Sequence, residues 1–95
     1  MSSNSHYLSA AIEQLASNMD KFSALIAFNA SISDKRLKKL LNVYPSLCII
    51  AERALQVGNI RRAEKYYALL KRIEKETNDR YAACIDDLER KMIGE

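Results

Sequence analysis

Residues 47–70 read LCIIAERALQVGNIRRAEKYYALL, and this stretch decides the fold. Apolar and small residues recur every three to four positions on both sides of Gly58-Asn59, which is the spacing of helices that bury one face. Gly58 can adopt the left-handed conformation in which helices often end, so one helix stops there and the next begins at Ile60. The stretch therefore predicts two antiparallel helices joined by a tight turn.

Proline 45 divides the sequence that precedes this hairpin. A short helix is predicted over 34–43, with Ser33 or Asp34 as its N-terminal cap. We expect it to end at Pro45, because the residue before a proline is pushed away from helical geometry. The hairpin then occupies 45–76.

A long N-terminal helix is predicted over 5–29. Its apolar residues alternate at steps of four and three, which places them on one narrow stripe: Leu8, Ile12, Leu15, Met19, Phe22 and Ile26. Such a helix is a rod of about 37 Å. Because so long a rod is hard to cover with the remaining residues, we expect part of the stripe to be left for a partner.

The segment Thr77-Asn78-Asp79 decides how the chain ends. These residues are good helix caps and poor helix interior, so we expect a break there and a separate helix over 78–93. One continuous helix over 60–92 is the alternative. The expected fold is all-α, with residues 1–95 forming a single domain of four to five helices in which the long N-terminal helix packs on the hairpin.

Composition excludes several other classes of protein. The 95 residues contain two glycines and one proline, too few for the turns of an all-β domain, and a doubly wound α/β fold lacks the room. No apolar run is longer than the five residues of 47–51, which is far too short to cross a bilayer. The first five residues lack the features of a signal peptide. Cys48 and Cys84 do not make a disulfide framework, so we expect a cytoplasmic protein.

Catalysis has few candidate residues. His6 is the one histidine, which leaves no Ser-His or Cys-His pair and no metal-ligand spacing. No glycine-rich phosphate loop is present. We therefore expect neither an enzyme nor a bound metal or cofactor.

The hairpin resembles a tetratricopeptide repeat. The resemblance rests on residues at the repeat's signature positions: Leu47, Ile50, Ala51, Ala54, Gly58, Asn59, Ile60, Ala63 and Tyr67. At the 34-residue period of that family, the first four map onto Tyr81, Cys84, Ile85 and Leu88, which are also apolar. The sequence departs from the family by lacking a proline near Lys75 and a repeat before Asn42. The Lys, Arg and Asn that grip a carboxylate in some members are absent.

About half of the chain resembles the small tetratricopeptide-type chaperones and co-chaperones of bacterial type III secretion systems. That resemblance implies a non-catalytic adaptor that buries an apolar helix or segment of a partner protein. The residues expected to bind the partner are Leu15, Met19, Phe22, Ile26, Leu55, Tyr66 and Tyr81. The same residues have a second interpretation, because apolar residues at helical spacing also form cores. Self-association through the stripe is a further possibility.

Nucleic-acid binding is the alternative function. The net charge is +3, and basic residues near Tyr66 could follow a phosphate backbone: Arg61, Arg62, Lys65 and Arg72. Glu64, Glu74 and Glu76 interrupt this stripe, which favours a solvated helix face. We expect no membrane partner, because the polar face of the first helix lacks cations.

Overall fold

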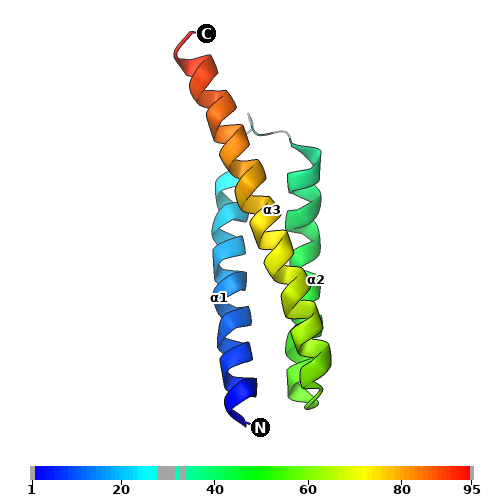
Figure 1. Ribbon diagram of the computed structural model, residues 1–95. Helices are drawn as coiled ribbons and strands as arrows, with labels where there is room; N and C mark the ends of the chain where they lie inside the picture. Colours follow the sequence, from blue (N-terminus) through cyan, green and yellow to red (C-terminus); the bar gives the residue numbers. More distant parts are fainter. Residues whose placement is uncertain (1, 28–31, 33, 95) are drawn as a thin grey trace.

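Three helices account for almost all of the described chain. The structure is a computed structural model that describes residues 2–27, 32 and 34–94. Within those residues α1 (Ser2–Ala27), α2 (Lys35–Gln56) and α3 (Ile60–Met92) run up, down and up in a bundle of 57 × 19 × 18 Å (Figure 1). The all-α class is confirmed, whereas the prediction of four to five helices is wrong.

Helix α2 passes through Pro45 without ending. The predicted boundary at 43–45 is therefore wrong, and the short helix 34–43 is the first half of α2. Proline in a helix interior removes the N–H that would bond to the carbonyl four residues back, at a cost of about 3 kcal/mol. Continuing the helix keeps Leu41, Tyr44 and Cys48 on one buried face. That packing offsets the loss at Pro45.

Helix α3 is likewise continuous through 77–79, so the expected break and the separate helix 78–93 are wrong. The three cap-forming residues find other roles inside the helix. Thr77 is fully buried, the amide of Asn78 donates to the carbonyl of Glu74 at 3.0 Å, and Asp79 pairs with Lys75 at 3.2 Å. Packing and local side-chain contacts outweigh the weak helix propensity of this segment.

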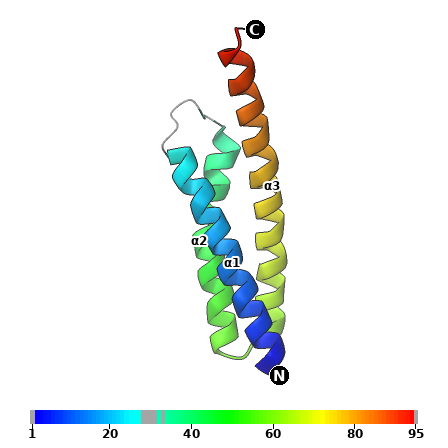
Figure 2. The same cartoon turned by 90° about the vertical axis from the view of Figure 1, so that its left-hand side faces the viewer.

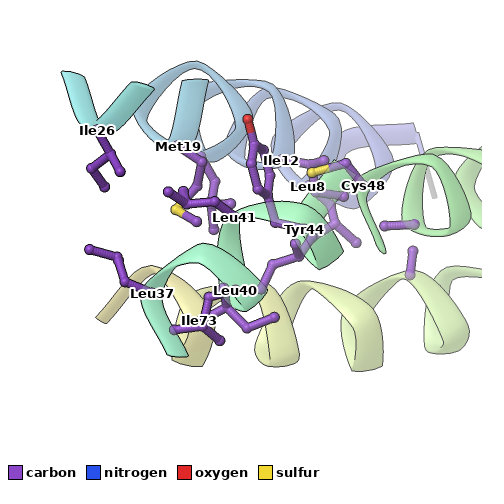
Figure 3. Close-up of a cluster of buried hydrophobic side chains, with 14 of the residues drawn as sticks. Leu8, Ile12, Met19, Ile26, Leu37, Leu40, Leu41, Tyr44, Cys48 and Ile73 are labelled. Carbon is purple, nitrogen blue, oxygen red and sulfur yellow. The ribbon is translucent and has the colours of Figure 1, made fainter. Parts of the chain in front are cut away.

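Helix α1 carries the predicted stripe, and the bundle encloses most of it. The helix begins at Ser2, and the predicted end at Phe28-Asn29 lies outside the described residues. The buried members of the stripe are Leu8, Ile12, Leu15, Met19 and Ile26. Figure 3 shows Met19 and Leu41 of α2 pointing toward one another. Because α2 and α3 are each one long helix, both can lie along α1 and cover it.

The hairpin turn lies where the sequence predicts it. Gly58 takes a φ of 77°, and the side chain of Asn59 accepts from the N–H of Arg62 at 3.1 Å. Ala51, Ala54 and Ala63 are buried between the helices, where their small side chains permit a close approach. The hairpin is nevertheless longer than one 34-residue tetratricopeptide repeat, because its two helices, α2 and α3, extend from residue 35 to residue 92.

An ion-pair network fastens the N-terminal end of α2 to the middle of α3. The Glu76 carboxylate accepts from Arg36 at 2.8 Å and from Arg80 at 2.7 Å, and Arg80 also reaches Asp34 at 3.3 Å. Asp34 caps α2 as predicted, by accepting from the N–H of Leu37 at 2.9 Å; Ser33, the other predicted cap, lies outside the described residues. The network fixes the two helices beside the point where α1 ends.

Candidate protein-interaction surface

The predicted partner-binding residues fall into three groups. Leu15, Met19 and Ile26 are buried in the core of the bundle, which is the second of the two interpretations offered by the sequence. Leu55 and Tyr66 are half-buried against the core near the hairpin turn. Phe22 and Tyr81 are half-buried at the other end of the bundle. The seven residues thus do not form one surface.

The structure brings Phe22 and Tyr81 together. Their rings meet edge to face, with centroids 5.4 Å apart and an interplanar angle of 67°. Tyr66 lies 15 residues before Tyr81, which is about 22 Å along a helix. The aromatic pair therefore marks the end of the bundle at which α1 stops, away from the hairpin turn.

A groove of about 330 Å³ opens beside this pair, between α1 and α3. Its floor is apolar, formed by Phe22 and Leu25, and the remaining lining residues are polar: Asn18, Lys21, Glu74 and Asn78. The amide of Asn18 donates to Glu74 at 3.3 Å, which links α1 to α3 across two of the lining residues. An apolar floor with a rim of mixed charge suits an amphipathic segment of a protein.

The apolar face of α3 continues beyond this groove. Both views show α3 extending past the end of α1 and the start of α2 (Figures 1 and 2). Cys84, Ile85 and Leu88 are half-buried there, while Met92 is 84 % and Ile93 is 72 % exposed. Leu25, on the last turn of α1, is 53 % exposed.

We define the apolar end as Phe22, Leu25, Tyr81, Ile85, Leu88 and Met92. Sequence reasoning named Phe22 and Tyr81 as partner-binding residues and missed the other four as part of this site. The signal that could have found the three on α3 is the spacing of three and four residues from Tyr81 to Met92, which repeats the spacing of the buried residues earlier in α3. That spacing predicts an apolar face, but only the relative lengths of the three helices show which part of it the described portions of α1 and α2 do not cover.

Neither of the two cysteine thiols is activated as a nucleophile. Burial raises the pKa of the Cys48 thiol and of the Cys84 thiol, which keeps both protonated. Across residues 2–27, 32 and 34–94, no three His, Cys, Asp or Glu side chains gather as metal ligands would.

The four basic residues of the alternative function lie exposed on α3. The guanidinium of Arg62 covers the ring of Tyr66, 5.2 Å from its centroid. Lys65, Tyr66, Leu69 and Arg72 line a shallow hollow on the outer side of the helix. None of Arg61, Arg62, Lys65 and Arg72 forms an ion pair with another described residue.

Fold and surface together define a small all-α protein of three helices. Comparison of the chain with protein-family models, with curated proteins and with solved structures finds no match. No helix in the described part of the chain has an apolar stretch long enough to cross a membrane.

Proposed function

We propose that this chain is a non-catalytic protein-binding module whose partner contributes an amphipathic helix to the apolar end. One observation carries the proposal: the apolar face of α3 continues past the last turn of α1, leaving Leu25 and Met92 exposed. A partner helix placed there extends the course of α1 along α3. Its apolar side covers Leu25, Ile85 and Met92, as α1 covers the earlier part of α3.

The tetratricopeptide-like character of residues 47–70 supports the same class of function, since such hairpins commonly present surfaces to other proteins. This resemblance favours a more specific proposal, in which the chain is an adaptor or chaperone in the cytoplasm. The binding surface differs from the one expected from the sequence, because Leu15, Met19 and Ile26 pack inside the bundle. The apolar end takes their place.

The nucleic-acid alternative has weaker support. One face of the Tyr66 ring is occupied by Arg62, so that face is not free to stack on a base. Glu64 lies among the cations on the same exposed side of α3.

Site-specific photocrosslinking in the native cell tests the proposal. A photoreactive amino acid replaces Leu25 in one version of the chain and Ile49 in another. Ile49 is the matched control, because it is also a large apolar residue that is more than half exposed, and it lies on α2. We expect one protein to be crosslinked through position 25 and not through position 49. Equal labelling from the two positions, or none from either, would overturn the proposal.

The crosslinked partner then permits a direct binding measurement. The variants Leu25→Glu and Met92→Glu place charges on exposed side chains, so the fold should survive, as circular dichroism would show. Each charge has to be desolvated under the partner helix, and we expect binding to weaken by about tenfold or more. Ile49→Glu should bind as the unaltered chain does.

A further inference from the structure

The outer face of α3 carries a regular pattern of charge. Lys65, Arg72, Asp79 and Asp86 follow one another at intervals of seven residues, so they lie in one row along the helix. We call this row the charge ladder. All four side chains are exposed, whereas the buried residues of α3, among them Leu70 and Thr77, lie on the opposite side.

Along α3 the ladder carries two positive charges followed by two negative charges. On an antiparallel copy of α3 the order is reversed, so each positive charge lies opposite a negative one. If a second α3 lies antiparallel to the first, Lys65 of one copy faces Asp86 of the other and Arg72 faces Asp79. Each of these pairs then occurs twice about a two-fold axis that passes between Lys75 and Glu76. A parallel arrangement places like charges together, so the ladder selects the antiparallel one.

The surface between the charges suits a close approach of two helices. Ala68 and Ala83 are exposed in this face, and the antiparallel register places them opposite one another. Lys75 lies close to the two-fold axis and pairs with Asp79 of its own chain at 3.2 Å, so in the dimer the Asp79 carboxylate is shared between this ammonium and Arg72 of the other copy. The outer face also lies away from α1 and α2, as the second view shows (Figure 2).

We infer that two copies of this chain associate through the charge ladder, with their α3 helices antiparallel. The ladder spans 22 residues, and the 21 steps between its ends cover about 31 Å of helix, so the contact runs along most of α3. Such an isologous contact closes on itself and yields a dimer, not a filament. It uses the side of α3 opposite the apolar end, which stays open in both copies. The inference is therefore independent of the proposed function.

Equilibrium sedimentation tests the inference with a charge exchange. The acidic variant is Lys65→Asp with Arg72→Asp, and the basic variant is Asp79→Lys with Asp86→Lys. We expect the unaltered chain at about 100 µM in low salt to show twice its 10.8 kDa mass, and about 1 M salt to dissociate it by screening the pairs. Each variant alone should be a monomer.

Mixing supplies the decisive result. An equimolar mixture of the acidic and basic variants should form a heterodimer, because the charges on one restore the complement of the other. Lys35→Asp with Lys38→Asp is the matched control, since it makes the same charge change on exposed residues of α2 and should leave the dimer intact. All the altered side chains are exposed, so helicity should not change.

Three outcomes would overturn the inference: an unaltered chain that is monomeric in low salt, an acidic variant that dimerises unchanged, or variants that fail to associate when mixed. A dimer that persists in about 1 M salt would assign the contact to an apolar surface instead. A monomer that binds a labelled oligonucleotide through Lys65 and Arg72 would assign those cations to nucleic acid. A monomer that still crosslinks through position 25 would leave the proposed function intact.

Discussion

The ring of Phe22 on α1 meets the ring of Tyr81 on α3 edge to face, with centroids 5.4 Å apart. Phe22 also forms part of the groove floor with Leu25. The pair therefore joins the closed core of the bundle to the apolar end that the proposed function uses.

A double-mutant cycle at Phe22 and Tyr81 should show that the pair is coupled. We expect each change to alanine to lower the free energy of unfolding by about 1–3 kcal/mol, because half-buried aromatic surface is lost. The coupling free energy should be about 0.5–1.5 kcal/mol, the range for edge-to-face aromatic pairs. Urea unfolding of the four proteins gives all the terms. Additive losses would show that the rings pack independently of one another.

Replacing Thr77 with valine should stabilise the chain. Thr77 is fully buried, and its Oγ1 has no hydrogen-bond partner among the described residues. Valine has nearly the same shape without the hydroxyl, so the penalty for a buried unsatisfied group disappears. We expect the free energy of unfolding to rise by about 1 kcal/mol, measured as a higher urea midpoint with an unchanged slope. Thr77→Ser, which keeps the hydroxyl and removes a methyl, should lower stability; a less stable valine variant would contradict the assignment.

Local signals in the sequence predicted the parts of the fold that depend on neighbouring residues. The turn at Gly58-Asn59, the cap at Asp34 and the stripe of α1 each arise from interactions within a few residues along the chain. The predictions that helices end at Pro45 and at 77–79 are both wrong for the same reason. There, weak local propensity is overridden by packing against helices distant in sequence, which no local pattern reveals.

The candidate surface was only partly predictable for a related reason. Spacing places Met19 and Phe22 on one stripe of α1, yet Met19 is fully buried and Phe22 borders an open groove. The difference depends on where along α1 the other helices lie. The predicted short helix 34–43 and the first helix of the hairpin are together one helix, α2. The second helix of the hairpin and the predicted helix 78–93 are likewise one helix, α3, so both are longer than predicted. Those lengths determine which end of the apolar stripe is covered.

Acid should weaken the chain through Glu76. Hydrogen bonds from Arg36 and Arg80 lower the pKa of this carboxyl from 4.5 to about 2 in the folded chain. A group with a lower pKa in the folded state contributes stability above its unfolded pKa and loses that contribution as the pH falls toward the folded value. We therefore expect the urea midpoint to fall between pH 4.5 and about pH 2, and Glu76→Gln to flatten that fall.

The control for Glu76 is Glu64→Gln. Glu64 is an exposed carboxylate on the same helix that forms no ion pair with another described residue. Its variant should follow the pH dependence of the unaltered chain. At neutral pH, Glu76→Gln should be the less stable of the two variants, because it breaks the contact between α2 and α3. Identical pH profiles for Glu76→Gln and the unaltered chain would show that the network contributes nothing to folding.

Replacing Pro45 with alanine tests whether α2 is held through its proline by packing. Alanine restores the N–H that can bond to the carbonyl of Leu41 and removes the clash of the ring with the preceding turn. The unfolded chain also gains freedom, which offsets about 1 kcal/mol of that gain. We expect a net rise of about 1–2 kcal/mol in the free energy of unfolding, measured by urea titration.

Ser46→Ala is the control for Pro45→Ala, because Ser46 is the adjacent exposed residue of α2 and keeps its N–H in both proteins. It should change stability by no more than about 0.5 kcal/mol, the difference in helix propensity. A gain confined to Pro45→Ala would show that α2 forms despite the proline, driven by the burial of Leu41, Tyr44 and Cys48 on α1 and α3. A lower free energy of unfolding for Pro45→Ala would contradict this. It would show that the bundle depends on a bend at the proline, which positions Leu41, Tyr44 and Cys48 against the other helices.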